Sequence, residues 1–504
     1  MNIAEAKEEI KTTVNAYLKK DDLGFFRISP AQQRPIFMVG APGIGKTAIM
    51  EQIASELGIG LVSYSMTHHT RQSALGLPMI VHRSYRNGED FDISEYTMSE
   101  IIAAIYDYME ETELDTGILF LDEINCVSET LYPSMLQFLQ FKTFGQHKVP
   151  DGWIVVCAGN PPEYNRSVHE FDIVTLDRLR TIQVEPDYDT WKNYARATHV
   201  HPAILTYLDV RPEDFYVVES TPEGKSFVSA RGWSDLSEYI TLLEEMGAPV
   251  GRPTISEFLQ HDEVAEHFAA YYELFSKYRS DYQIESILRG EEAPEIHARA
   301  KEAQFDERLA LLGLILDGIC KEMREVLDEG GVLMSVRDDL RALKDKLIAG
   351  DSANELFDAA VLKHHEQANL KQKRSHNAAD ARAELRVVEI LHELEFATKA
   401  KGGQEAFDAL QAAYQEKVAA FNTSADVCSE HLDNAFSFIE TVFGNDREML
   451  VFVTELTARS ESSQFISQFG SETYYAHNQD LMVEQTRDDL IEEIDELEEE
   501  HNKR

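Results

Sequence analysis

The chain has few of the features that place a protein in a membrane or in an oxidising compartment. No stretch approaches the roughly 20 apolar residues that a membrane-spanning helix requires. The segment from Met1 to Lys20 is charged and amphipathic and lacks the apolar region of a secretory signal. The 4 cysteines are widely separated and show neither metal-ligand nor redox spacing. The composition therefore predicts a soluble, cytoplasmic protein with buried, reduced thiols.

Positive charge is also scarce. There are 47 basic residues against 90 acidic ones, which gives a formal net charge of -43. Such a surface repels nucleic acid and anionic membranes, so protein partners are favoured, although the charge also serves solubility. The one basic stretch, residues 362–386, lacks the interleaved aromatic residues of a nucleic-acid track and is predicted to be a solvated helix face.

The pattern of strands and helices divides the 504 residues into two parts. In roughly the first 190 residues, strand-like runs alternate with helical or looping stretches, which is typical of an α/β fold with a doubly wound parallel sheet. After a break rich in glycine and proline at residues 247–253, the pattern is helical throughout. The expected strands are Pro35 to Val39, Leu61 to Ser65, Gly117 to Asp122, Trp153 to Ala158 and Thr181 to Val184.

A glycine-rich run, Gly-Ala-Pro-Gly-Ile-Gly-Lys-Thr, follows the first expected strand and precedes a helical pattern. Its glycines allow a tight turn whose backbone N–H groups face phosphate, Lys46 reaches the β- and γ-phosphates, and the Thr47 hydroxyl ligates Mg²⁺. A helix that starts near Lys46 adds its positive N-terminal dipole. The predicted nucleotide-binding residues in this run are Gly40, Pro42, Gly43, Ile44, Gly45, Lys46, Thr47 and Ala48.

An acidic pair, Asp122 and Glu123, follows the third expected strand. The carboxyl ends of parallel strands form the edge at which α/β proteins bind ligands. Asp122 is predicted to share the Mg²⁺ shell with Thr47, and Glu123 is predicted to orient and activate an attacking water. Either motif alone can arise by chance, but their order and placement support each other. Together they predict that the chain binds and hydrolyses a nucleoside triphosphate.

Two insertions interrupt the α/β pattern. Residues 68–97 contain Gly76-Leu77-Pro78 and two β-rich pieces, Met79 to Ser84 and Asp90 to Thr97, which predict a hairpin closed by a tight turn at Asn87-Gly88. Residues 144–151 predict a second hairpin or loop. The first hairpin is a candidate lever or client contact, and a passive surface hairpin is the alternative.

Further motifs resemble those of the AAA+ superfamily. The fourth strand leads to Asn160 in a run similar to the sensor-1 segment, which implies that this amide contacts the γ-phosphate or the attacking water. The run Leu-Asp-Arg-Leu-Arg is similar to the segment that carries an arginine finger, with Arg178 the first choice and Arg180 the reserve. Ser229-Ala230-Arg231 is similar to the start of the sensor-2 helix, which implies that Arg231 lies over the γ-phosphate. The predicted catalytic residues are Glu123, Asn160, Arg178 and Arg231.

Within that superfamily, the inserted hairpin and the Gly-Leu-Pro run resemble the MoxR-like branch. The resemblance covers about residues 31–243. It implies a five-stranded parallel sheet of order 5-1-4-3-2 with a hairpin insert in residues 1–187, a small helical lid at 188–247, and a helical C-terminal extension at 254–504. Proteins of this branch commonly work beside a von Willebrand factor A domain partner, and no such domain is evident in this chain.

The leading hypothesis is a Mg²⁺-dependent, ATP-hydrolysing ring, expected to be a hexamer, that remodels or activates a protein client in a chaperone-like way. An alternative is a nucleotide-gated scaffold or switch that recruits a partner through the helical C-terminal region. A nucleic-acid motor is disfavoured by the negative charge. A motor subunit for metal insertion into a tetrapyrrole shares the same inserts, so the sequence leaves that hypothesis open.

Overall fold

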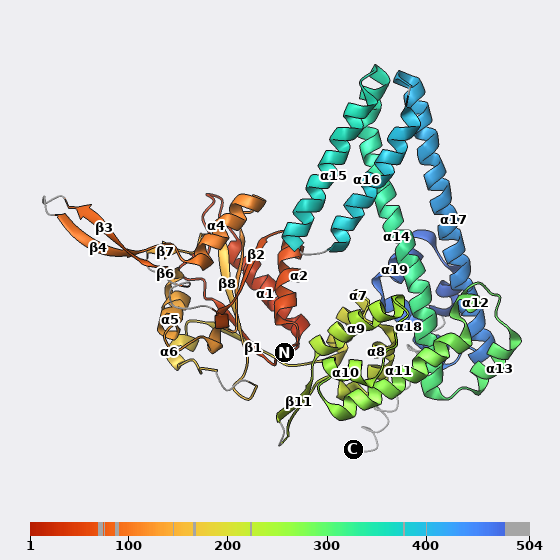
Figure 1. Cartoon of the computed structure of the whole chain (residues 1–504), viewed down its shortest axis with the longest axis horizontal. Coiled ribbons are helices and arrows are strands. Elements are labelled where there is room, and N and C mark those ends of the chain that lie inside the picture. Colours follow the sequence, from red (N-terminus) through yellow and green to blue (C-terminus); the bar gives the residue numbers. More distant parts are fainter. Residues whose placement is uncertain are drawn as a thin grey trace, which may run out of the picture. The chain divides into compact units, whose positions relative to one another are not determined.

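The computed structural model describes residues 1–68, 74, 76–85, 90–144, 146–164, 168–221, 224–375, 378–399 and 401–478. These residues form two compact units (Figure 1). The first comprises residues 1–191 together with 229–232 and 370–375, and the second comprises 192–228, 233–369 and 378–478. Within the described residues, no helix is both long enough and apolar enough to cross a membrane.

A five-stranded parallel sheet forms the centre of the first unit. Each expected strand is present, with ends that differ by at most one residue from the prediction. The strands are β1 (Ile36–Gly40), β2 (Gly60–Ser65), β5 (Gly117–Asp122), β8 (Trp153–Gly159) and β9 (Arg180–Val184). The spatial order is β2-β5-β8-β1-β9. These labels differ from the predicted 5-1-4-3-2 because they also count the strands of separate hairpins; numbered within this sheet alone and read from β9, the strands follow that order.

Helices cover the sheet, as its sequence requires. Strand β8 is buried along its whole length and β5 along all but its last residue, because a central parallel strand is covered on both faces. Alternate residues such as Leu119 and Val155 pack with apolar side chains of α4 (Glu100–Thr112) and α5 (Tyr132–Phe141) in one core. The other helices of this part are α1 (Ile3–Leu18), α2 (Lys46–Leu57), the short helix η1 (Met66–His68), the short helix η2 (Ile124–Cys126) and α6 (Ile173–Leu176).

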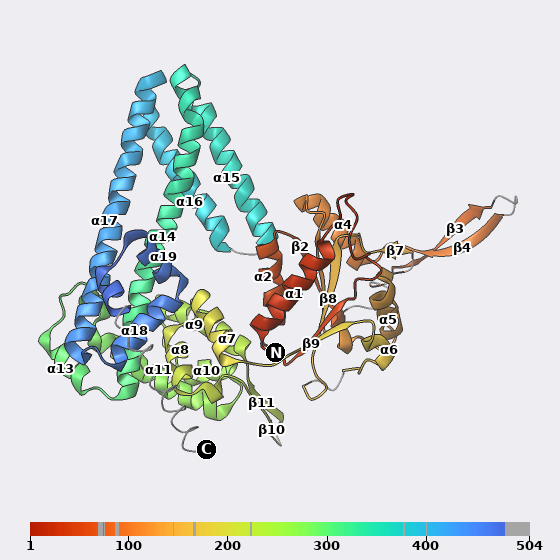
Figure 2. The same cartoon turned by 180° about the vertical axis from the view of Figure 1, so that it is seen from behind.

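Both insertions are antiparallel hairpins. The first consists of β3 (Pro78–Ser84) and β4 (Asp90–Tyr96), and it projects from the rest of the first unit in Figures 1 and 2. The predicted turn at Asn87-Gly88 lies outside the described residues. At the hairpin base a Cβ on Gly76 would lie 2.1 Å from the Thr97 carbonyl oxygen, so only glycine fits there. The second insertion contains β6 (Thr143–Phe144) and β7 (His147–Lys148).

Residues 188–247, predicted as a helical lid, contain three helices and a hairpin. The helices are α7 (Tyr188–Ala197), α8 (Pro202–Val210) and α9 (Ala230–Glu245), and the short helix η3 (Pro212–Asp214) follows α8. The strands β10 (Val217–Thr221) and β11 (Gly224–Val228) pair as an antiparallel hairpin. Helix α9 ends before Gly247 and the next helix begins at Arg252, so the helices are interrupted at the glycine- and proline-rich run, and both sides of this interruption belong to the second unit.

The C-terminal region is helical in all its described parts, as expected. Its longest helices, α14 (Phe305–Ala349) and α17 (Gly403–Phe443), lie side by side in a bundle with α16 (Ala378–Thr398), and Figures 1 and 2 show this bundle from two sides. The remaining helices are α10 (Arg252–Phe258), α11 (Asp262–Tyr282), α12 (Ile284–Leu288), α13 (Pro294–Glu302), α15 (Ala353–Ser375), α18 (Arg447–Ala458) and α19 (Ser460–Phe469).

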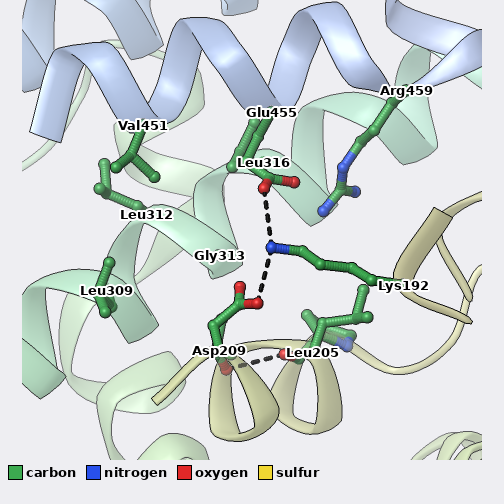
Figure 3. Close-up of a pocket in the computed structure, with 12 residues that line it drawn as sticks. Lys192, Leu205, Asp209, Leu309, Leu312, Gly313, Leu316, Val451, Glu455 and Arg459 are labelled. Carbon is green, nitrogen blue, oxygen red and sulfur yellow. Dashed lines mark hydrogen bonds and ion pairs between the residues drawn. The ribbon is translucent and has the colours of Figure 1, made fainter. Parts of the chain in front are cut away.

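Charged and close apolar contacts join α7 and α8 to α14 and α18 within the second unit. Figure 3 shows the Lys192 ammonium between two carboxylates, 2.7 Å from Asp209 Oδ1 and 3.3 Å from Glu455 Oε1. Arg196 also donates to Glu455, through Nε at 3.0 Å. The pair of carboxylates borders a cavity of about 40 Å³ that is otherwise lined mainly by apolar side chains. The two lid-region helices and the C-terminal helices therefore share one packed interface.

The closest approach in this interface requires glycine at residue 313. A Cβ on Gly313 would lie 2.6 Å from Thr206 Cγ2 on α8. Thr206 cannot easily rotate away, because its hydroxyl donates to the Pro202 carbonyl at 2.8 Å and accepts from the Tyr271 hydroxyl at 2.8 Å. Helix α14 can therefore approach α8 this closely only where it has no side chain.

We expect Gly313→Ala to lower the stability of the second unit. The added methyl group forces α8 and α14 apart, and overpacking of this kind typically costs about 1–3 kcal/mol. The measurement is the thermal unfolding midpoint by circular dichroism. Gly331→Ala is the matched control, because it lies in the same helix and its added Cβ meets no atom within 4 Å. The control should gain about 0.5–1 kcal/mol from the helix preference of alanine. Equal midpoints for the two variants would contradict the close packing.

Candidate active site

The glycine-rich run forms a loop between β1 and α2, and it needs its glycines for two reasons. Gly43 and Gly45 have φ angles of 74° and 96°, in the left-handed region that glycine adopts without strain. Gly40 lies so close to β9 that a Cβ would be 2.7 Å from the Val184 carbonyl oxygen. Helix α2 begins at Lys46, as predicted, so its unpaired N–H groups face the space enclosed by the loop.

Lys46 is buried within this loop, with 7% of its surface exposed. Its ammonium donates to the carbonyls of Gly40 and Ala41, both at 2.8 Å, and to Asn160 Oδ1 at 3.0 Å. Burial lowers the pKa of Lys46 to about 8, and the attraction of Asp122 only partly opposes this effect. Burial destabilises the charged form of Lys46, and the negative charge of a phosphate group would stabilise it again. The site is therefore suited to a polyanionic ligand.

Thr47 and Asp122 place two oxygen atoms side by side at the end of β5. The Thr47 hydroxyl donates to Asp122 Oδ2 at 3.2 Å. Mg²⁺ prefers oxygen ligands and is commonly bound by one or two protein groups together with substrate phosphates and water. The donor set of this pair therefore fits a magnesium ion beside a triphosphate, as the sequence predicts.

Glu123 lies beyond the strand end in the left-handed conformation, with φ of 54°, and its N–H donates to Asp122 Oδ1 at 2.8 Å. This turn directs the Glu123 carboxylate toward the end of β2. There Glu123 Oε2 accepts hydrogen bonds from Ser65 at 3.3 Å and from Thr67 at 3.1 Å. Two hydroxyl groups therefore fix the side chain that is predicted to activate water.

Asn160 follows β8 and is held at both its side chain and its backbone. Its side-chain oxygen accepts from Lys46, while its main-chain carbonyl accepts from Asn125 Nδ2 at 2.8 Å. A cavity of about 600 Å³ adjoins this point, bordered by Gly40, Asn125 and Asn160 together with apolar residues of the sheet face such as Phe37.

Arg231 reaches the same loop through its backbone. Its N–H donates to the Gly43 carbonyl at 3.0 Å, and a Cβ on Gly43 would lie 2.8 Å from Ser229 Oγ. The positive charge of Arg231 contributes to the lowered pKa of Lys46, after burial, so the two cations are close enough to interact. Added negative charge between them would relieve this repulsion.

The structure does not bring Arg178 to this cluster. Arg178 follows α6 and is exposed; within the described residues its guanidinium makes no hydrogen bond or ion pair, apart from an electrostatic attraction to Asp172. The reserve candidate, Arg180, forms an ion pair with Glu9 of α1. Of the two arginines, Arg178 is thus the one whose side chain remains available to another molecule.

Four residues of the site were not predicted from the sequence: Ser65, Thr67, Asn125 and Ser229. Ser65 ends β2, and a hydroxyl residue at the carboxyl end of a parallel strand is a usable signal, since ligands bind at that edge. Asn125 has no comparable pattern, and in the run that contains Ser229 only Arg231 was predicted to have a role. The roles of Asn125 and Ser229 depend on contacts with Asn160 and Gly43, which are distant in sequence.

The comparison with protein families agrees with this geometry. Residues 36–166 match the model of the ATPase family associated with various cellular activities (AAA). The match begins at β1 and includes the phosphate loop, the acidic pair and Asn160, and it ends before Arg178 and Arg231. No curated protein matches the chain. Residues 36–166 are therefore similar to the AAA ATPase domain, which supports ATPase activity of this general type.

Proposed function

We propose that this chain is a MoxR-like AAA+ enzyme that hydrolyses Mg²⁺-ATP as an oligomeric ring and uses the energy to remodel or activate a protein partner. The observation that carries the proposal is the single cluster formed by Lys46, Thr47, Asp122, Glu123 and Asn160, which has a group for each task of phosphoryl transfer. A von Willebrand factor A domain protein is the partner that the resemblance implies.

Each residue of the cluster has a distinct role in this proposal. Lys46 binds the β- and γ-phosphates. The oxygens of Thr47 and Asp122 would hold Mg²⁺, which would neutralise phosphate charge. Glu123 orients the attacking water and accepts its proton, and the Asn160 amide binds the γ-phosphate or that water. Arg231 adds positive charge from the start of α9. Glu123 favours an active ATPase over the scaffold alternative, because a binding module needs no water-activating carboxylate.

The surface around Arg178 supports assembly. Helix α6 is a single turn capped by Asp172, whose carboxylate accepts from the Thr175 N–H at 2.7 Å. The turn exposes 84% of Ile173 and 58% of Val174. Exposed branched apolar side chains next to an unpaired arginine are typical of an interface. We propose that a second copy covers this surface and receives Arg178 at its triphosphate site, where such an arginine accelerates hydrolysis about 10³-fold or more.

The projecting hairpin is the proposed client contact. Its register pairs Val81 with Ile93 and Arg83 with Phe91, so these side chains share one face. Phe91 is half exposed and meets Tyr85 edge to face, with ring centroids 5.9 Å apart. The same face carries the ion pair of Arg83 with Glu95, so it offers a protein partner both apolar and charged contacts.

The first prediction separates nucleotide binding from hydrolysis. Lys46→Ala should lose affinity for ATP, because the cation that faces the phosphates is removed. Glu123→Gln should bind ATP with near wild-type affinity and lose about 10²-fold or more in kcat, because its amide cannot accept the proton of water. Calorimetric titration with ATP and a phosphate-release assay measure the two effects. Hydrolysis by Glu123→Gln at the wild-type rate would refute its assigned role.

The second prediction tests whether Arg178 acts on a neighbouring copy. Arg178→Ala should bind ATP but lose most turnover. Lys46→Ala protein assayed alone should lose both ATP binding and turnover. Mixing the two should restore part of the activity, since some sites then combine an intact Lys46 with an intact Arg178. Arg180→Ala is the matched control and should retain turnover. A wild-type rate per subunit that stays constant on dilution into monomers would rule out assembly-dependent hydrolysis.

The third prediction concerns the hairpin. Replacing residues 79–96 with a short glycine-serine linker should leave basal ATP hydrolysis within a few-fold of wild type, because the hairpin contributes none of the described site contacts. Glu123→Gln protein with the intact hairpin should co-purify with a client in the presence of ATP, whereas the same variant with the linker should not. Equal recovery of the client would show that the hairpin is dispensable for binding.

A further inference from the structure

Asn125 has a buried polar side chain, and the mechanism proposed above gives this side chain no role. It lies two residues after Glu123 in η2, with 5% of its surface exposed. A buried primary amide is costly unless its hydrogen-bonding groups find partners, so its partners indicate why it is there.

Two of the partners of Asn125 belong to the segment that follows β8. Its Nδ2 donates to the main-chain carbonyl of Asn160 at 2.8 Å, and its own main-chain carbonyl accepts from the His169 N–H at 2.8 Å. Its Oδ1 faces the thiol of Cys126, which donates at 3.9 Å. These contacts fix which end of the amide points toward Asn160.

The shape of the neighbouring strand end matches this amide. A Cβ on Gly159 would lie 2.5 Å from Asn125 Oδ1 and 2.8 Å from its Cγ. Only glycine at residue 159 therefore leaves room for the Asn125 side chain. Gly159 and Asn160 therefore fix the position of the Asn125 amide group, Gly159 through close packing and Asn160 through a hydrogen bond.

The amide completes a chain of contacts across the active site. Lys46 donates to the side chain of Asn160, Asn125 donates to the backbone of Asn160, and Asn125 is joined to Glu123 through a single intervening residue. We propose that Asn125 is a positioning residue for ATP hydrolysis: its side-chain amide holds the backbone of Asn160 and thereby fixes the Asn160 amide relative to the Glu123 carboxylate. This inference rests on the proposed ATPase function.

The physical basis is the sensitivity of phosphoryl transfer to position. Asn160 and Glu123 follow different strands, and the hydrogen bond from Asn125 to Asn160 links the two turns directly. A displacement of about 1 Å in a catalytic group can lower the rate by about 10²-fold. Nucleotide binding depends mainly on Lys46 and the loop, and among the described residues Asn125 makes no hydrogen bond to either. Loss of the amide should therefore affect kcat more than KM.

The test uses two variants of the full chain. Asn125→Asp keeps the size of the side chain, but its carboxylate cannot donate to the Asn160 carbonyl, and Asn125→Ala removes the group. Both should lower kcat by about tenfold to a hundredfold while KM for ATP changes less than about threefold. Glu129→Ala, an exposed residue in the same segment, is the control and should retain wild-type kinetics. A wild-type kcat in Asn125→Asp would overturn the proposal.

A double-mutant cycle decides whether Asn125 acts through Asn160. Asn125→Asp should cost little further kcat in an Asn160→Ala background, because the group that it positions is already gone. Full additivity would show that Asn125 acts independently and would overturn the proposal, even if the single variant is slow. A purely structural role would instead lower the unfolding midpoint and raise KM together with the loss of kcat.

A measurement without turnover separates this inference from the proposed function. Amide hydrogen exchange in the peptide that spans residues 156–162 should become faster in Asn125→Asp, because the segment loses its hydrogen bond from the Asn125 side chain. If the wild type does not hydrolyse ATP, the proposed function fails, whereas the exchange still reports whether Asn125 holds Asn160. Unchanged exchange in the variant would overturn the positioning role by itself.

Discussion

The buried ammonium of Lys46 is the interaction on which the active site depends. A charge inside a protein is stable only when polar groups replace the lost water, and Lys46 has two main-chain carbonyls and the side-chain oxygen of Asn160. Those acceptors come from the loop after β1 and from the end of β8. The cation therefore holds the first turn of α2 against two neighbouring strands and defines where a triphosphate would lie.

The parallel sheet explains why the remaining groups meet at this point. The side chains of Ser65, Asp122 and Asn160 come from the carboxyl ends of three strands, and parallel strands bring those ends to one edge. The left-handed turn at Glu123 then directs its carboxylate back toward β2, where Ser65 and Thr67 donate to it. The parallel direction of the strands brings these side chains to one edge of the sheet, and the turn at Glu123 sets the direction of its carboxylate.

The second unit depends on a different constraint, which is close packing between helices. The absence of a side chain at Gly313 lets α14 approach Thr206, and the ion pairs of Lys192 with Asp209 and Glu455 lie at the border of the same interface. Helices α8 and α14 are about 100 residues apart in sequence but belong to one compact unit. In this unit the region predicted as a lid shares its packing with the C-terminal helices.

The local features of this protein follow from its amino-acid sequence. Hydrophobic period and the placement of glycine and proline, which act between near neighbours, predict the five strands, the start of α2 at Lys46, the hairpin of the first insertion and the helical C-terminal half. Tertiary structure alone decided which long-range partners those elements have. No sequence pattern predicts the close packing of Asn125 against Gly159 or of Gly313 against Thr206. Each contact depends on two chain segments, distant in sequence, that approach within a few ångströms. The exposure of Arg178 and the pairing of Arg180 with Glu9 likewise became distinguishable only when α1 was placed beside β9.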